Sequence, residues 1–319
     1  MRLSESVVEM ERVRLAHRTE RVAKTTGLGV LGGFLFGSVF VIVGILIVLV
    51  GLKVVPVDPA TVHAPNWVLA LIGVIFAVSG LLVWSMVLQE RLLVIRRQIM
   101  AARHPRSEVY ADYPWDLKGI TKSTWEPVGK SLGATMFFAV FLAPFNWWAW
   151  LSEAGELMVK VIVSVFDLCL LLSAIELVRR ILVAVKYGKS RLEYEMFPIL
   201  TGLPAEFRWF APAGLERATR ITFVLRCVEE WMESRGTGKQ RSTILIHEQL
   251  WAAIRKTEGP VDCPSNCLIS LSFDVPATAP GSNLSEKLRI IFWELEVCAE
   301  APGVDFQERY LVPIYPGKL

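Results

Sequence analysis

The sequence predicts four transmembrane helices followed by a soluble, all-β domain of the sandwich class. Hydrophobic residues make up 53% of the 319 residues, which is more than a soluble protein of this length needs for its core. Four apolar stretches each reach the roughly 20 residues that a helix needs to cross a hydrocarbon layer about 30 Å thick. Beyond residue 189 the apolar residues change from helical spacing to alternation, as in strands with one buried face.

The predicted organisation has five parts along the chain. They are an amphipathic segment at 1–26, a transmembrane hairpin at 27–89, a cytoplasmic loop at 90–130, a second transmembrane hairpin at 131–187 and a soluble β domain at 188–319. The net charge of +3 comes from 34 basic residues spread among 31 acidic ones, so no basic surface for nucleic acid is indicated. The lipid bilayer is therefore the first expected partner.

The N-terminal segment mixes acidic and basic side chains before the first apolar stretch. That stretch, at 27–55, is too long for the core of a signal peptide, so we expect no cleavage. The segment is typical of a short amphipathic helix on the membrane surface, and a partner-binding arm is the alternative.

Basic residues predict the orientation of the four apolar stretches, which lie at 27–55, 66–89, 131–151 and 158–186. Lysines and arginines crowd the central loop and the end of the fourth stretch, whereas the two short connections carry few charges. The positive-inside rule then places both termini, the central loop and the β domain in the cytoplasm. Trp67 and the tryptophans at 147, 148 and 150 fall on the opposite side, where indoles favour the headgroup region.

Glycines in the first stretch predict close helix packing. Gly29, Gly33 and Gly37 repeat every four residues and share one helical face, and Gly44 and Gly51 continue it at seven-residue steps. Packing within the chain and packing between two chains both remain open at this point. Glycine is also common in membrane helices without any specific packing role.

Asp167 is the most unusual residue of the membrane half, because it lies near the middle of the fourth stretch. A carboxylate there costs about 3 kcal/mol on insertion scales, which the surrounding apolar residues can offset. One interpretation is a proton or ion site formed with Glu176 and with Asn146 or Thr135 from the third stretch. The other is a hydrogen-bonded acid that holds the helices together.

Alternating residues in the last third of the chain predict a sheet with one buried face. Ile221, Phe223, Leu225 and Cys227 share a face, as do Trp293, Leu295 and Val297 later in the chain. Turn-rich clusters separate these runs, and about seven short strands fit an antiparallel sandwich.

The strings LRCVEEW, SFDVPATAP and WELEVCAEAPGVDFQERYLVPIY resemble the C-terminal domain of a group of uncharacterised bacterial inner-membrane proteins. The likeness covers about the last 130 residues. SFDVP, a loop with Pro280 and then LRIIFWELEV also resemble a strand pair of arrestin-like sandwiches, which are scaffolding rather than catalytic folds; an immunoglobulin-like sandwich is the alternative. The resemblance implies a bacterial inner membrane but no activity. Members often carry an extracytoplasmic β domain, for which the outer loops here are too short.

Patterns of catalysis and metal binding are weak. Cys263 and Cys267 have a spacing that suits zinc, but structural or free thiols are the favoured interpretation, and a disulfide between them is a further alternative. His247 is followed by Glu248 but lacks the second histidine of a zinc-protease helix. We therefore expect no catalytic residues, no metal and no cofactor.

The function expected from the sequence is that of a non-enzymatic scaffold or adaptor, either by itself or as a subunit of a larger assembly. The expected partner is another protein or a second copy in a homo-oligomer. The candidate contact surface lies around a predicted hairpin and consists of Trp231, Arg235, Lys239 and Arg241. The alternative is a small transporter or ion-coupled component that uses Asp167.

Overall fold

A computed structural model of the chain describes residues 3–6, 29–57, 65–103, 109–151, 157–235, 242–257, 266–285 and 289–317. These residues form two compact units. The helical unit takes its residues from 29–94 and 125–181, and the β unit takes its residues from 3–6, 95–124 and 182–317.

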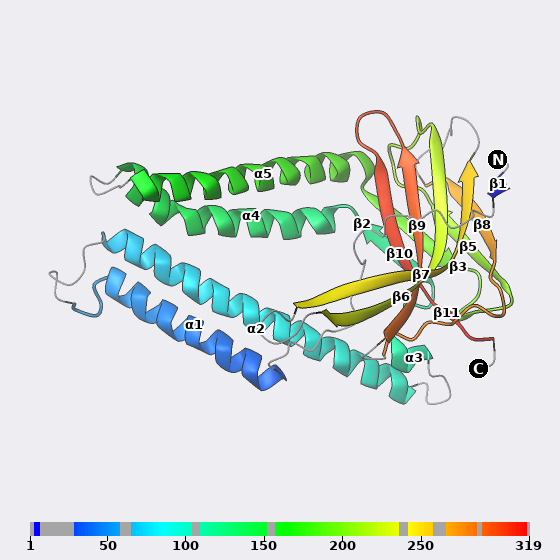
Figure 1. The fold of residues 1–319 in the computed structure, drawn as a ribbon, viewed down its shortest axis with the longest axis horizontal. Coiled ribbons are helices and arrows are strands. Elements are labelled where there is room, and N and C mark those ends of the chain that lie inside the picture. The colour runs from blue at the N-terminus through cyan, green and yellow to red at the C-terminus, as the bar shows by residue number, and fades with distance from the viewer. Residues whose placement is uncertain are drawn as a thin grey trace. The chain divides into compact units, whose positions relative to one another are not determined.

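Four long helices carry the apolar stretches of the sequence (Figure 1). They are α1 (Gly29–Gly51), α2 (Asn66–Arg103), α4 (Trp125–Asn146) and α5 (Leu157–Tyr187). By length and composition, each is long and apolar enough to cross a membrane. Pro144 lies inside α4, which ends two residues later and continues as a π-helical turn, η1 (Trp147–Leu151). Proline removes a backbone donor, so a loosened helix is expected at this point.

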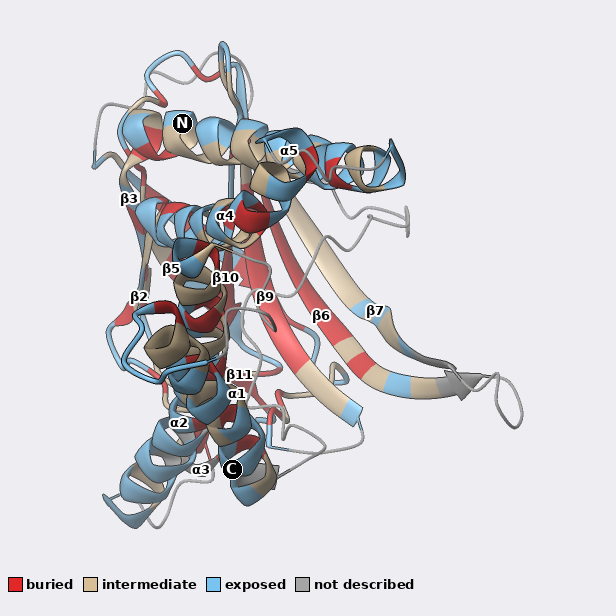
Figure 2. Ribbon diagram, turned by 90° about the vertical axis from the view of Figure 1, so that its left-hand side faces the viewer, coloured by how far each residue is buried: buried red, intermediate tan, exposed pale blue. Residues whose placement is uncertain are grey.

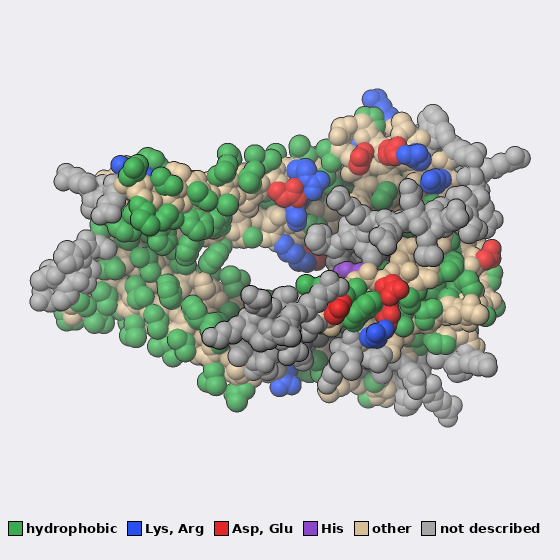
Figure 3. All heavy atoms as spheres, viewed as in Figure 1, with side chains coloured by type: hydrophobic (Ala, Val, Ile, Leu, Met, Phe, Trp, Pro, Cys, Tyr) green, Lys and Arg blue, Asp and Glu red, His purple; other side chains and the backbone are tan. Residues whose placement is uncertain are grey.

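Apolar side chains cover most of the face of these helices that Figure 3 shows. On α5, for example, Leu168, Leu171 and Leu172 are each more than half exposed, at 56%, 56% and 58%. A surface helix of a water-soluble protein keeps a polar face, whereas a helix that is apolar all round suits a core or a lipid environment. The helices therefore have the surface that the composition predicted.

The β unit contains two larger antiparallel sheets and one short strand pair. The strands are β1 (Leu3–Ser6), β2 (Gly119–Ser123), β3 (Lys189–Tyr194), β4 (Ile199–Leu200), β5 (Pro204–Phe210), β6 (Arg220–Arg235), β7 (Ser242–Thr257), β8 (Leu268–Asp274), β9 (Arg289–Glu300), β10 (Phe306–Val312) and β11 (Ile314–Tyr315). The five-stranded sheet has the order β1-β7-β6-β9-β10, and the four-stranded sheet has the order β2-β3-β5-β8. β4 pairs with β11 in parallel.

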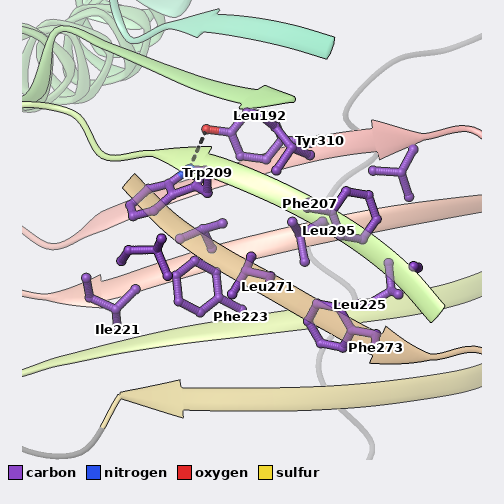
Figure 4. Close-up of a cluster of buried hydrophobic side chains, with 14 of the residues drawn as sticks. Leu192, Phe207, Trp209, Ile221, Phe223, Leu225, Leu271, Phe273, Leu295 and Tyr310 are labelled. Carbon is purple, nitrogen blue, oxygen red and sulfur yellow. Dashed lines mark hydrogen bonds between the residues drawn. The ribbon is translucent and has the colours of Figure 1, made fainter. Parts of the chain in front are cut away.

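One hydrophobic cluster takes side chains from both larger sheets (Figure 4). Trp209 of β5 and Tyr310 of β10 are fully buried, and the Trp209 indole N–H donates a hydrogen bond to the Tyr310 hydroxyl over 3.2 Å. The predicted apolar face of β6, with Phe223 and Leu225, lies in this cluster, as does Leu295 of β9. Alternation therefore identified the buried face of these strands. β6 and β7 are longer than expected, at 16 residues each.

The segment expected to be a cytoplasmic loop contributes to the β unit. Its strand β2 pairs with β3 antiparallel, and a short helix, α3 (Val109–Asp112), precedes it. The buried Asp112 carboxylate accepts hydrogen bonds from the Ser285 backbone N–H at 2.6 Å and the Tyr315 hydroxyl at 2.7 Å. Trp115 donates to the same hydroxyl at 2.9 Å. The segment is thus fixed to Ser285 and to Tyr315 of β11, about 170 and 200 residues later in the chain.

Candidate functional site

The β6–β7 ribbon extends beyond the third strand of its sheet. On β6, the pairing with β9 ends at Trp231, which lies opposite Arg289 of β9. The pairing with β7 continues along β6 to Arg235, which lies opposite Ser242 of β7. Four residue pairs, beginning with Met232 and Leu245, therefore form a two-stranded end among the residues that the structure describes. We call these residues, 232–235 and 242–245, the distal ribbon. Figure 2 shows burial fading from β9 and the inner part of β6 toward this end.

The distal ribbon presents apolar side chains. Met232 is 48% exposed and Ile244 is 36% exposed. Trp231 at its base is half-buried, and the Arg289 guanidinium lies 5.1 Å from the centre of its ring. Arg289 also forms an ion pair with Glu229 at 3.1 Å. Ile244 lies on the same face of the ribbon as Trp231, whereas Met232 lies on the opposite face. An exposed apolar residue on the same face as an aromatic and an arginine is typical of a protein-binding surface.

The other predicted contact residues are only partly placed. Arg235 is the last residue of β6, but its side chain is outside the described part of the structure, and Lys239 and Arg241 lie outside the described residues altogether. The structure therefore places Trp231 at the base of the ribbon.

Most of the outer edge of β7 is open among the described residues. β1 pairs with β7 only from Ile254 to Thr257, so no described strand covers β7 from Ser242 to Ala253. The register with β6 shifts between Cys227 and Val228, which leaves Leu250 as an extra residue on β7. The run before this bulge is regular. An edge of this kind carries backbone groups that can pair with another strand.

Side chains of β7 alternate between two faces along this run. Ile246 lies opposite Trp231 on one face, together with Ile244 and Glu248. His247 lies on the other face, opposite Glu230, and the His247 Nε2 atom is 2.8 Å from a carboxylate oxygen of Glu230.

A buried ionic cluster occupies the face of β6, β9 and β10 that points away from the hydrophobic core. The Arg226 side chain is fully buried and pairs with Glu294 and, at 3.0 Å, with Glu296; Arg309 pairs with Glu296 at 2.8 Å. Burial raises the pKa of Glu296, but the Arg226 charge, a hydrogen bond from Gln307 and the Arg309 guanidinium outweigh it, and the net pKa is lowered. Two positive and two negative charges balance, so this cluster joins three strands rather than attracting an ion.

Alternation alone did not reveal this cluster. Arg226, Glu294 and Glu296 occupy positions that alternate with core residues, and the sequence pattern therefore suggested an exposed face. The sequence does contain a signal for this cluster, namely oppositely charged residues on strands that are neighbours in the sheet. Reading that signal requires knowledge of the strand order.

In the helical unit, polar side chains join α4 and α5. The Asn146 amide donates a hydrogen bond to Asp167 at 2.8 Å, and Thr135 and Ser173 share another of 2.8 Å. The structure thus brings together two of the three predicted intramembrane residues. Glu176, the third, forms ion pairs with arginines 179 and 180 on its own helix.

Glycines of α1 and α2 meet along a close helix contact. A Cβ on Gly37 would lie 2.6 Å from the Trp84 side chain, and one on Gly44 would lie 2.6 Å from the Gly73 carbonyl oxygen. Gly33 likewise faces Val87 at 2.6 Å. The predicted close packing therefore occurs within the chain. Gly29 is the first residue of α1, and the described contacts do not include it.

The cysteines do not form a described metal site. Among the residues that the structure describes, no group of three His, Cys, Asp or Glu side chains could hold a metal ion. Cys267 is a half-buried free thiol, and Cys263 lies outside the described residues. Burial, with a contribution from Glu229, raises the pKa of Cys227 to about 12, and burial is also the main reason that the pKa of Cys298 is raised to about 11. Thiols with such pKa values are poor nucleophiles at neutral pH.

No protein-family model matches the chain, and no curated protein matches it. Among solved structures, it is similar to the sporulation control protein Spo0M from Bacillus subtilis, with 9% identity and a TM-score of 0.28 over 40% of this chain and 48% of that one. It is also similar to a DUF4466 family protein from Parabacteroides merdae, with 13% identity and a TM-score of 0.21 over 39% of this chain and 44% of that one. The chain thus spans less than half the length of either structure.

Proposed function

We propose that this protein is a multi-pass protein of a bacterial inner membrane that holds a cytoplasmic, arrestin-like β-sandwich as a protein-interaction module. It acts as a scaffold or adaptor rather than as an enzyme. The observation that carries the proposal is the distal ribbon, where exposed apolar side chains adjoin an open strand edge.

The helices support the membrane part of the proposal. Each of the four is long enough to span, and their exposed surfaces are apolar. Basic residues gather in the sequence between α2 and α4 and at the end of α5, which favours the cytoplasm for the segments that build the β unit.

The charged and thiol groups of the β unit support a binding role over a catalytic one. The charges of the cluster around Arg226 pair with one another, and the thiols of Cys227 and Cys298 are held in the protonated form by burial. Neither set supplies a reactive group to a substrate.

A second candidate function is ion-coupled transport centred on Asp167. A carboxylate within an apolar helix favours it, because intramembrane acids often lie on ion or proton pathways. The hydrogen bond from Asn146 supplies a structural use for the same carboxylate. Asp167→Asn keeps an acceptor for that bond and removes the charge, so loss of transport by this variant in liposomes, with its fold intact, would favour the second candidate.

Crosslinked affinity purification from native membranes tests the proposed module. The full-length protein is compared with a variant that carries Met232→Glu and Ile244→Glu, and with a control, Leu203→Glu, at a residue that is 45% exposed elsewhere in the β unit. We expect a stoichiometric partner with the wild type and the control, and its loss with the ribbon variant. Equal recovery from all three proteins, or no partner from any, would contradict the assignment of binding to the ribbon.

A further inference from the structure

We propose that the open edge of β7 binds an extended segment of a partner protein as an added antiparallel strand, with a lysine or arginine of that segment opposite Glu248. This inference rests on the proposed function, because it specifies how the interaction module would recognise its partner.

The open edge is long enough for strand addition. The regular run from Ser242 to the residue before the bulge, Gln249, has eight residues, which at about 3.4 Å per residue extends about 27 Å. Strands of five or six residues are typical of folded proteins, so this run can accept a complete strand.

The composition of the run leaves the edge accessible. Exposed edges in natural proteins are commonly protected by lysine, proline or a bulge, yet STILIHEQ contains no Lys, Arg or Pro. The basic residues of β7, Arg255 and Lys256, lie where β1 already pairs. The bulge at Leu250 ends the regular run, and the part paired with β1 begins four residues later, at Ile254.

The existing pairing indicates the direction of the added strand. β1 pairs antiparallel with β7, from Leu3 opposite Thr257 to Ser6 opposite Ile254. Every strand pair of the five-stranded sheet is antiparallel. A partner strand beside Ser242–Gln249 in the same direction as β1 would continue the line of β1 along an edge that already accepts such a strand.

The side chains of one β7 face specify the partner. An antiparallel segment would place three alternate residues opposite Glu248, Ile246 and Ile244 in turn. An opposite charge facing Glu248 is favourable and a like charge is unfavourable, while β-branched or other apolar residues suit the two isoleucines. The expected segment therefore reads Lys or Arg, any residue, apolar, any residue, apolar.

A second copy of this chain fits the edge less well than a basic partner. Two β7 edges paired about a two-fold axis through Ile246 would place Glu248 opposite Ile244. The run contributes no basic residue that could face the carboxylate in such a pair. A basic, apolar segment of another protein satisfies all three positions.

Peptide binding to the full-length protein in lipid nanodiscs tests this inference. The probes are two fluorescein-labelled peptides, GSKTVTVSG and its charge-reversed form GSETVTVSG, and binding is followed by fluorescence anisotropy. The protein variants are Glu248→Lys and a matched control, Glu206→Lys, at an exposed position of the other sheet. Hydrogen exchange of the β7 amides, with and without peptide, reports whether the edge forms backbone bonds.

We expect the wild type and the control to bind the lysine peptide about three- to tenfold more tightly than the glutamate peptide, and Glu248→Lys to reverse this preference. The amides of residues 242–249 that point away from β6, which alternate along the strand, should gain protection on binding. Binding without reversal by Glu248→Lys, absence of binding, or full protection of these amides in the free protein would overturn the inference. The last result would mean that another part of the chain or a second copy already covers the edge. If the purification recovers a partner that depends on the ribbon but the peptide assay gives any of these results, the proposed interaction module stands and strand addition is rejected.

Discussion

Gly44→Ala should separate α1 from α2, because the added methyl group has no room. Its Cβ would lie 2.4 Å from the backbone nitrogen of Ala77 and 2.6 Å from the carbonyl oxygen of Gly73. Both atoms belong to backbone, so neither can rotate away. Restoring an ordinary contact of 3.4 Å or more requires the helices to move apart by about 1 Å.

The expected cost is that of overpacking, about 1–3 kcal/mol. Gly133→Ala on α4 is a matched control, since a Cβ there meets nothing within 4 Å. This control should be neutral or slightly stabilising, because alanine has the higher helix propensity. The two substitutions add the same methyl group, so their difference isolates the contact between α1 and α2.

Unfolding by sodium dodecyl sulfate in mixed micelles measures the difference, with the distance between fluorescent probes on α1 and α2 as the signal. The variant Gly44→Ala should unfold at a lower detergent fraction than the wild type, and Gly133→Ala should not. Equal midpoints for both variants would refute the close contact, and a destabilised control would show that the method detects alanine itself.

The other predictions concern polar groups. Asp167→Asn should leave the stability in detergent within about 0.5 kcal/mol of the wild type, because the new amide oxygen can still accept a hydrogen bond from Asn146. Asp167→Ala removes this acceptor and should lower the stability by about 1 kcal/mol in the same assay. Arg226→Met should lower the free energy of unfolding by about 3–5 kcal/mol, since it removes a buried positive charge from beside the buried carboxylates of Glu294 and Glu296, and chemical denaturation measures this. The pKa of Glu296 is lowered in the folded protein, so the ionised carboxylate stabilises the fold in full above the ordinary pKa of 4.5. This stabilisation is lost as the pH falls through the lowered pKa, and denaturant midpoints should therefore drop on acidification. The Cys298 thiol, with its pKa raised to about 11, should react with iodoacetamide about a hundredfold more slowly at pH 8 than a free cysteine, and faster as the pH approaches 11.

Features that depend on local periodicity could be predicted from the sequence. The apolar stretches at 27–55 and 158–186 correspond to α1 and α5, because a run of some twenty apolar residues is a strong signal by itself. The core face of β6, with Phe223 and Leu225, followed equally from alternation. The glycine repeat indicated close packing, but only the structure shows that α2 is the helix that fills it.

Features that depend on distant pairing could not be predicted in this way. β2 lies in a stretch without clear alternation, and its pairing with β3 joins residues about 70 positions apart. The burial of Arg226 depends on β9 lying beside β6 and on β10 lying beside β9, with their glutamates and arginine on the same face. Among the described residues, the open edge of β7 likewise follows from the strand order and from the register of β1, which pairs only with Ile254–Thr257.

Paired reporter fusions test the central claim, that the four apolar helices cross the membrane and hold the β unit in the cytoplasm. Green fluorescent protein, which fluoresces when folded in the cytoplasm, and alkaline phosphatase, which is active outside it, are each fused after Leu319 and, in separate chains, after Val57. We predict fluorescence without phosphatase activity after Leu319, and phosphatase activity without fluorescence after Val57. Phosphatase activity after Leu319, or fluorescence after Val57, would contradict the account.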